Sequence, residues 1–98
     1  MTLPVIFHEF AENELNEAVE YYAQARPGLG EAFLAEVQGA VDALAATPLA
    51  GQAVEGDVRW WLVRRFPYSV FYRVRADHIR VLAIGHQKRR PFYWRGRR

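Results

Sequence analysis

The sequence predicts an α+β fold in which an antiparallel helical hairpin packs on a small, mainly antiparallel sheet. Three observations predict it: an apolar strand pattern near the N-terminus, two amphipathic helical patterns joined by a short turn, and three strand patterns gathered toward the C-terminus. The predicted order is β-α-α-β-β-β, and a chain that separates its helices from most of its strands forms a two-layer domain. With 98 residues, the chain is long enough for one domain, residues 1–98, with a single core.

The N-terminal part of the chain predicts one strand and one helix. Residues 3–8, LPVIFH, are rich in β-branched and aromatic side chains, as in a buried strand. From Glu9 to about Ala25, small and apolar side chains recur at steps of four, three and four residues. This period is typical of an amphipathic helix. Its glutamates fall largely on the other faces, and we interpret them as a solvated surface.

A second helix is predicted from about Gly30 to Thr47. Pro27 and Gly28 interrupt the first helix, because proline disfavours helical geometry at the residue before it and glycine permits a turn. Pro48 ends the second helix. Because the connection between the two helices is short, they must lie antiparallel.

The remainder of the chain predicts one loop and three strands. Glycines and weak periodicity indicate a loop at residues 49–57, and the strand patterns begin at Val58, Tyr68 and His78. The short connections between these patterns make neighbouring strands antiparallel.

The last strand pattern, HIRVLAIGH, is apolar on both faces. Strict alternation places Val81 and Ala83 on one face, and Leu82 and Ile84 on the other. Both faces are therefore substantially apolar at the far end of this strand, and one face is charged near the turn.

Composition and missing motifs exclude several classes of function. The chain has no cysteine, so it forms no disulfide framework, and its 51% hydrophobic content is that of a folded protein. It has no glycine-rich phosphate loop and no HExxH pattern, and its three histidines have no cysteine to join them in a metal site. Neither a leader pattern nor an apolar run of membrane-spanning length occurs. We expect a cytoplasmic protein without a metal, a cofactor or a membrane partner.

Charge divides the chain into two unequal parts. Residues 1–58 contain ten acidic residues and one basic residue, a net charge of −9, whereas residues 59–98 contain twelve basic residues and one acidic residue, a net charge of +11. Such asymmetry predicts a polyanionic partner for the basic part, either nucleic acid or an acidic polypeptide. The alternative is that two oppositely charged layers attract each other within the fold.

The C-terminal residues combine basic and aromatic side chains. Arginine presents a planar fork that matches phosphate or carboxylate oxygens, and aromatic rings between arginines can stack on bases. The basic residues that follow the last strand are Lys88, Arg89, Arg90, Arg95, Arg97 and Arg98, and the aromatic residues are Phe92, Tyr93 and Trp94. The alternative for Tyr93 and Trp94 is that they fold back over the edge of the sheet. We expect residues 87–94 to form an ordered edge and residues 95–98 to be mobile.

Three stretches of the sequence resemble a known family: PGLGEAFLAEVQGAVDALAATPLAGQ, VRRFPYSVFYRV and VLAIGHQKRRPFYW. Together they are similar to the RelE/ParE superfamily, the toxins of bacterial type II toxin–antitoxin modules, once described as plasmid-stabilisation proteins. The resemblance covers nearly the whole chain and implies the same element order. It also implies a cognate antitoxin that wraps and neutralises the toxin, with the possibility of a higher-order complex.

The superfamily contains two activities, and the resemblance favours the ParE-like branch. RelE-like members cut mRNA on the ribosome, and that alternative makes His86 or Tyr93 the acid or base and Arg64, Arg65 and Arg89 the phosphate binders. ParE-like members inhibit DNA gyrase. Ser69 and Gln87 stand where the nuclease branch has basic residues.

The gyrase interpretation assigns target binding to Arg89, Arg90, Phe92, Tyr93 and Trp94. A third alternative is a degenerate toxin that acts only in antitoxin binding and operon regulation. We therefore expect DNA gyrase as the target, with the ribosome and its mRNA as the alternative.

Overall fold

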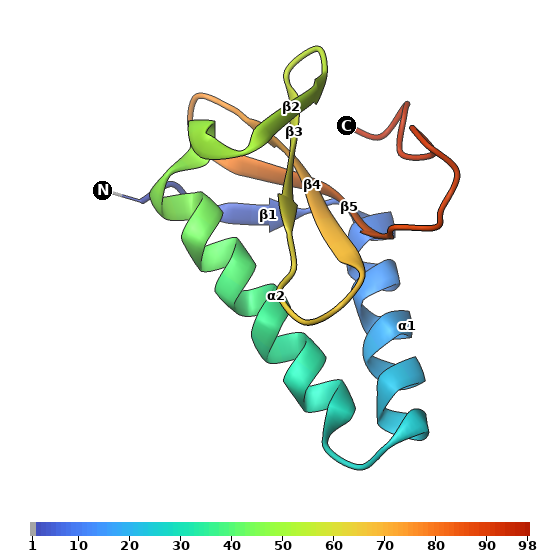
Figure 1. Cartoon of the computed structure of the whole chain (residues 1–98). Helices are drawn as coiled ribbons and strands as arrows, with labels where there is room; N and C mark the ends of the chain where they lie inside the picture. Colours follow the sequence, from blue (N-terminus) through green and yellow to red (C-terminus); the bar gives the residue numbers. More distant parts are fainter. Residues whose placement is uncertain (1) are drawn as a thin grey trace.

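The computed structural model describes residues 2–98 and contains two helices against one face of a five-stranded sheet. The elements, in chain order, are β1 (Val5–Phe7), α1 (Glu9–Ala25), α2 (Leu29–Ala46), the 3-10 turn η1 (Pro48–Ala50), β2 (Gln52–Glu55), β3 (Val58–Leu62), β4 (Tyr68–Val74) and β5 (Ile79–His86). Figure 1 shows the sheet above the helices in that view. The predicted fold class is confirmed.

The sheet has the strand order β1-β5-β4-β3-β2. β1 is parallel to β5, and the other neighbours are antiparallel. A β-bulge interrupts the β4–β5 register, because Phe71 lies opposite Ala83 while Tyr72 lies opposite Val81. Leu82 is therefore the additional residue on β5.

One prediction about this sheet was wrong. Residues 49–57 are not simply a loop, since they contain η1 and the edge strand β2. β2 has exposed or half-buried side chains throughout and pairs on one side only, with β3. A strand with no buried face carries no alternating apolar pattern, so its sequence does not distinguish it from a loop.

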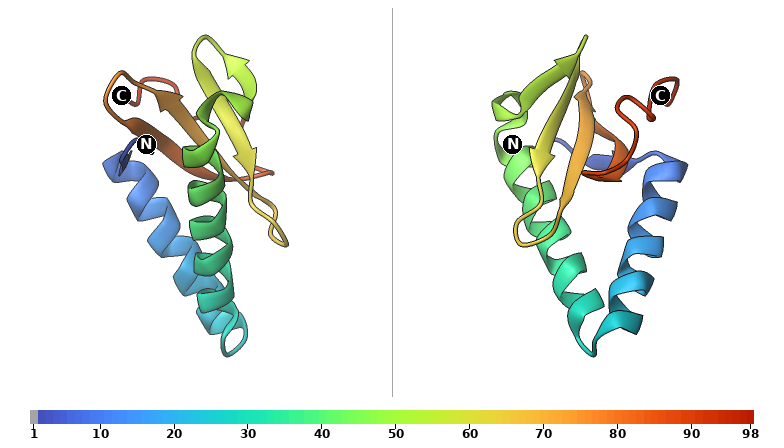
Figure 2. Two further views of the ribbon diagram at one scale, coloured as in Figure 1. Left: turned by 90° about the vertical axis from the view of Figure 1, so that its left-hand side faces the viewer. Right: turned by 45° about the vertical axis from the view of Figure 1, so that its right-hand side comes forward.

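The helices form because small apolar residues recur on the faces that they bury. Ala11 and Ala18 of α1 are buried, as are Phe33, Val37 and Leu44 of α2. α1 begins at its N-cap His8, whose Nδ1 accepts a hydrogen bond from the backbone of Phe10 at 3.0 Å. Figure 2 shows that the turn between the helices projects well beyond the strands.

Gly30 explains how closely the two helices meet near that turn. A Cβ atom at this position would lie 2.7 Å from the carbonyl oxygen of Val19 and 2.9 Å from Cβ of Ala23. Only glycine therefore allows the first turn of α2 to approach the backbone of α1.

Two apolar clusters cover the two faces of the sheet. The larger cluster lies between the helices and the sheet, and it includes Phe33, Val70, Tyr72 and Ile79. The smaller cluster lies on the opposite face and includes Leu82, Ala83, Phe71 and Trp94. The C-terminal segment, defined here as residues 87–98, thus covers the face that the helices leave free. No helix within residues 2–98 is long and apolar enough to cross a membrane.

Candidate interaction site at the C-terminal segment

Within residues 2–98, no strand lies beside the second half of β5 on the edge that faces away from β4. β1 contains only three residues and pairs with the beginning of β5. Farther along this edge, Glu14 of α1 accepts a hydrogen bond from the backbone N–H of Ile84 at 3.0 Å. Arg97 of the C-terminal segment donates a hydrogen bond to the backbone carbonyl of Leu82, also at 3.0 Å. Since buried backbone polar groups require partners, these two side chains take the place of a strand.

Glu14 and Arg97 also form a two-pronged ion pair. Their carboxylate and guanidinium atoms lie 2.9 and 3.1 Å apart, and both side chains are only 13% exposed. Charge-assisted bonds with this parallel geometry are stronger than single exposed ion pairs. The pair therefore fastens the end of the C-terminal segment to both α1 and β5. The interpretation of all the α1 glutamates as solvated was wrong for Glu14.

Tyr93 lies across Gly85 of β5 with its hydroxyl group turned into the protein. That hydroxyl oxygen is buried and has no hydrogen-bond partner within residues 2–98. Burial raises the pKa of Tyr93, and the Glu14 carboxylate raises it further. The phenol is therefore protonated at neutral pH. The guanidinium carbon of Arg89 lies 3.9 Å from the ring centroid, a cation–π contact on the outer side.

Trp94 holds the C-terminal segment on the sheet. It is 3% exposed, and its ring centroid lies 5.4 Å from that of Phe71 in β4. Phe92, which adopts a φ of 61°, and Tyr93 are half-buried. Trp94 and Tyr93 thus both fold back over the sheet, as one of the two sequence interpretations proposed, and Phe92 and Tyr93 keep part of their surface exposed.

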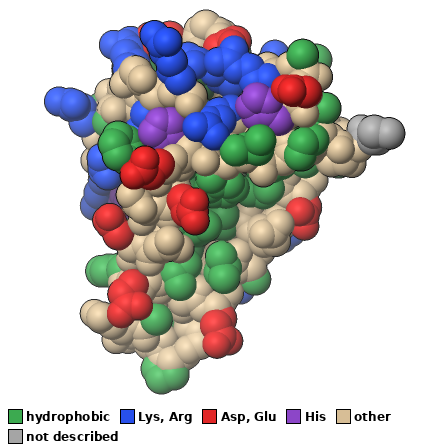
Figure 3. Space-filling view, turned by 180° about the vertical axis from the view of Figure 1, so that it is seen from behind, with side chains coloured by type: hydrophobic (Ala, Val, Ile, Leu, Met, Phe, Trp, Pro, Cys, Tyr) green, Lys and Arg blue, Asp and Glu red, His purple; other side chains and the backbone are tan. Residues whose placement is uncertain are grey.

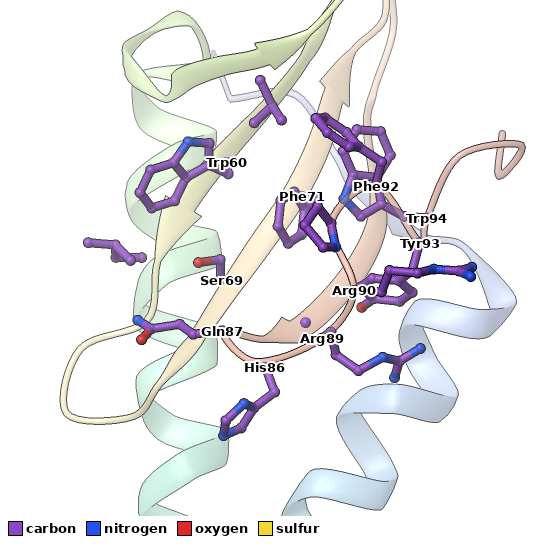
Figure 4. Close-up of a pocket in the computed structure, with 14 residues that line it drawn as sticks. Trp60, Ser69, Phe71, His86, Gln87, Arg89, Arg90, Phe92, Tyr93 and Trp94 are labelled. Atoms are coloured by element: carbon purple, nitrogen blue, oxygen red, sulfur yellow. The ribbon is translucent and has the colours of Figure 1, made fainter.

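A hollow of about 360 Å³ opens between the C-terminal segment and the β2–β3 hairpin. Figure 4 shows Trp60 of β3 on one side, residues 92–94 on the other, and Phe71 of β4 between them. Leu62 of β3 also lines the hollow and is 50% exposed. The molecule therefore has an apolar recess that is open to solvent.

Basic side chains border this hollow on the side of the C-terminal segment. Arg89 and Arg90 line it, and both extend outward in Figure 4. Arg89 lies 3.9 Å from Glu14, whereas neither Lys88 nor Arg90 forms an ion pair within residues 2–98. Figure 3 shows from behind that basic side chains gather at the sheet end of the molecule, away from the tip of the helical hairpin. The hollow is thus bordered by positive charge, and Arg90 there has no acidic partner within residues 2–98.

A comparison with protein families places this chain in a known group. A family model described as the ParE toxin of the type II toxin–antitoxin system, parDE, matches residues 5–91. The chain belongs to this ParE family. The expected ParE-like branch of the RelE/ParE superfamily is therefore confirmed.

Among solved structures, one similar fold is described as a chromosomal ParDE TA system from P. aeruginosa. The two chains superpose with a TM-score of 0.70 at 21% sequence identity, covering 87% of this chain and 96% of the other. At this identity the likeness shows a shared fold. No curated protein sequence matches the chain significantly.

The five residues considered for a nuclease site lie in two separate places in the structure. His86, Arg89 and Tyr93 line the hollow. Arg65 lies in the turn between β3 and β4, where its guanidinium nitrogen is 3.6 Å from a carboxylate oxygen of Glu36 in α2. Arg64, beside it, is exposed and does not line the hollow. The two arginines of the turn are therefore not part of the arrangement around Tyr93.

Ser69 and Gln87 also line the hollow. Ser69 is 6% exposed, so it contributes to the floor rather than to the outer surface. The backbone N–H of Gln87 donates to the carbonyl of Pro67 at 2.8 Å, which ties the start of the C-terminal segment to the β3–β4 turn. Neither side chain supplies a positive charge, so the basic groups of the hollow lie on its rim.

The expected mobility of residues 95–98 stays a prediction, but two of these residues make specific contacts. Arg95 pairs with Glu55 of β2, and its Nε donates to that carboxylate at 2.8 Å. Arg97 makes the Glu14 contacts already described. Residues 2–98 contain no group of three or more side chains that would hold a metal ion.

Four residues of this region were not predicted from the sequence as part of the site: Glu14, Arg97, Trp60 and Leu62. A signal for Glu14 was present, because it lies three residues after Ala11 and four before Ala18, both of which are buried. A glutamate on the apolar face of a helix needs a partner. The partner, Arg97, is 83 residues away in sequence, and nothing local links the two.

Proposed function

We propose that this chain is the toxin of a type II toxin–antitoxin pair and that it inhibits DNA gyrase through contacts made by its C-terminal segment. Membership of the ParE family supports the toxin role. The observation that carries the surface assignment is the open apolar hollow bordered by Arg90, which forms no ion pair within residues 2–98. Apolar anchors with a charged rim are typical of protein–protein interfaces.

A cognate antitoxin is the second partner in this proposal. An extended or helical antitoxin segment would neutralise the toxin by covering part of its surface, and both proteins would act in the cytoplasm. The similar ParDE structure supports the existence of an antitoxin partner, because its description names a toxin–antitoxin system. We further propose that the toxin–antitoxin pair stabilises a plasmid and that the two proteins form a higher-order complex.

The alternative of a ribosome-dependent mRNA endonuclease has less support. The hydroxyl oxygen of Tyr93 is buried, and burial raises the pKa of this group, which makes it a poor base. Arg64 and Arg65 lie in a separate turn, and one of them faces Glu36. His86 and Arg89 do lie close to each other along the hollow, which is the observation in favour of this alternative.

Induction of the chain in a host that lacks the antitoxin tests the proposal. Translation would be followed by pulse labelling and DNA damage by a reporter in the same culture. Gyrase inhibition predicts an early damage response while translation continues. A prompt fall in translation without early damage would reverse the ranking of the two targets, and neither response would favour a degenerate toxin.

Substitution of the basic edge tests which surface acts. Replacing Arg89 and Arg90 with alanine should abolish toxicity, while the free energy of unfolding falls by less than about 1 kcal/mol, because exposed charges contribute little to stability. Arg26→Ala, at an exposed position after α1, is the matched control and should remain toxic. A double variant that unfolds, or one that remains fully toxic, would contradict the assignment.

A further inference from the structure

The hollow beside the C-terminal segment presents apolar surface that no part of residues 2–98 covers. Trp60 is half-buried and Leu62 is 50% exposed, although both lie in β3, which pairs with β4 along its length. Phe71 forms the floor between them and Trp94. A hollow of about 360 Å³ is large enough for one or two apolar side chains but small for a separate domain.

The two sides of the hollow differ in charge. On the β2–β3 side, two acidic side chains are already paired with cations from elsewhere: Glu55 of β2 pairs with Arg95 of the C-terminal segment, and Asp57 accepts a hydrogen bond from Arg73 of β4 at 2.8 Å. On the side of the C-terminal segment, Lys88 and Arg90 are exposed and form no ion pair within the described part of the chain. An occupant is therefore attracted from one side only.

We propose that the hollow is the anchor site for the target and takes an apolar side chain from a segment of DNA gyrase that carries acidic residues on one flank. This inference rests on the proposed function. The apolar side chain enters between Trp60 and the aromatic residues of the C-terminal segment. The acidic residues beside it lie over Lys88 and Arg90. A buried anchor supplies most of the affinity, and the exposed charges mainly increase the rate of encounter.

The occupant is a polypeptide rather than a nucleic acid because of the polarity of the hollow. Its floor is formed by Phe71 and the buried Ser69, and the cations stand on one rim. A phosphate backbone would need cations along its path. The observed arrangement suits an apolar side chain with charges to one side.

Leu62→Asp tests the apolar anchor. This substitution places a carboxylate at the wall of the hollow, where it would be desolvated by an apolar occupant and repelled by acidic neighbours. Inhibition of plasmid supercoiling by purified gyrase holoenzyme should weaken by about tenfold or more, the effect of losing roughly 1.4 kcal/mol of binding. Leu49→Asp is the matched control, because Leu49 is 69% exposed on η1 and does not line the hollow. Its inhibition should equal that of the wild type.

Arg90→Glu tests the charged flank. It should weaken inhibition most at low salt, because screening removes the contribution of exposed charges at high salt. Arg26→Glu makes the same change in net charge at an exposed position in the acidic part of the chain. It should leave inhibition unchanged at every salt concentration. Equal effects of the two reversals would overturn the assignment of the flank.

Failure of this inference can be distinguished from failure of the proposed function. If the wild-type chain does not inhibit gyrase, the proposed function fails. If the wild type inhibits and Leu62→Asp inhibits equally well, the anchor site is overturned. A Leu62→Asp variant that inhibits gyrase but no longer binds its antitoxin would also overturn it, because the hollow would then belong to the antitoxin.

Folding of the variants is checked by thermal unfolding. Leu62→Ser, which removes the apolar wall without adding charge, gives a second test if the aspartate variant unfolds. It should inhibit gyrase less well than the wild type and better than Leu62→Asp. Wild-type inhibition by a folded Leu62→Ser variant would contradict the proposal.

Discussion

Gly85 in β5 allows the aromatic part of the C-terminal segment to lie directly on the sheet. A Cβ atom at this position would be 2.7 Å from the hydroxyl oxygen of Tyr93 and 3.2 Å from Cε2 of Phe71. Real Cβ atoms do not approach other atoms so closely, so any side chain here would displace one ring or the other. The residue therefore connects the strand to the wall of the hollow.

Gly85→Ala is expected to lower the free energy of unfolding by about 1 to 3 kcal/mol, the usual cost of inserting a methyl group into a packed site. Gly39→Ala is the control, because this exposed position in α2 has nothing within 4 Å of an added Cβ. It should raise stability by about 0.5 to 1 kcal/mol through better helix propensity. Urea unfolding measures both changes.

Removing the hydroxyl group of Tyr93 provides the mechanistic check. Gly85→Ala combined with Tyr93→Phe should recover part of the loss, because the closest contact involves the Tyr93 oxygen. If the double variant is as unstable as the sum of the two single variants, the clash with Tyr93 is not the cause.

At the scale of elements, β1 is too short to pair with the whole edge of β5. Side chains from α1 and the C-terminal segment form the hydrogen bonds that a longer β1 would have made. Because β1 leaves the sheet after Phe7, two backbone groups on the remaining edge of β5 depend on Glu14 and Arg97. The same ion pair therefore completes the sheet and positions the segment that carries Arg89 and Arg90. Sheet integrity and the shape of the proposed interaction surface are coupled through it.

Glu14→Ala is expected to lower the free energy of unfolding by about 2 to 4 kcal/mol, because it leaves a mostly buried arginine and a backbone N–H without their partner. Glu17→Ala, an exposed glutamate in the same helix, should change stability by less than about 0.5 kcal/mol. Hydrogen exchange adds a local measurement, since the Ile84 amide should lose protection in the first variant only. Unchanged protection of that amide would show that the Glu14 hydrogen bond does not matter.

Elements with a buried face could be predicted from the sequence, and those without one could not. α1 spans Glu9–Ala25, as its period of apolar residues indicated, and α2 differs by one residue at each end from the expected range. β2 was not predicted, because its side chains are mostly exposed and show no alternating apolar pattern. Strict alternation in the last strand also failed, because the bulge at Leu82 puts Leu82 and Ala83 in one cluster and Ile84 in the other.

The candidate site was predictable in composition but not in arrangement. The sequence located Arg89, Arg90 and Phe92 in the C-terminal segment, and these residues do border the hollow. It could not show that Trp60 and Leu62 form the opposite wall. That contact depends on the register of β2, β3 and β4, which local periodicity does not encode.

For the whole molecule, the charge asymmetry serves the fold only in part. The following ion pairs join the basic part of the chain to the acidic part: Arg65–Glu36, Arg73–Asp57, Arg75–Asp57, Arg89–Glu14, Arg95–Glu55 and Arg97–Glu14. Attraction between the two parts is therefore real. It leaves Lys88 and Arg90 unpaired within residues 2–98, so internal attraction does not account for the basic edge.

Alkaline pH tests the packing of the whole core, because buried and half-buried tyrosines are distributed over both faces of the sheet. Burial raises the pKa of Tyr22, Tyr68 and Tyr72 on the helix side and of Tyr93 on the other side. The folded protein therefore holds these protons more tightly than the unfolded chain, in which tyrosines titrate near pH 10. Their contribution to stability is intact below that value and is lost as pH rises through it toward the folded values.

The free energy of unfolding should thus fall between about pH 9 and pH 11, and phenolate absorbance should appear together with unfolding. Tyr72→Phe isolates one contribution. It removes the hydroxyl that donates to the carbonyl of Pro48 at 2.7 Å, so the variant should be less stable at neutral pH but lose less stability on the alkaline side. A stability that is flat across this range, or phenolate absorbance that develops fully in the folded protein, would mean that these rings are not packed as the structure places them.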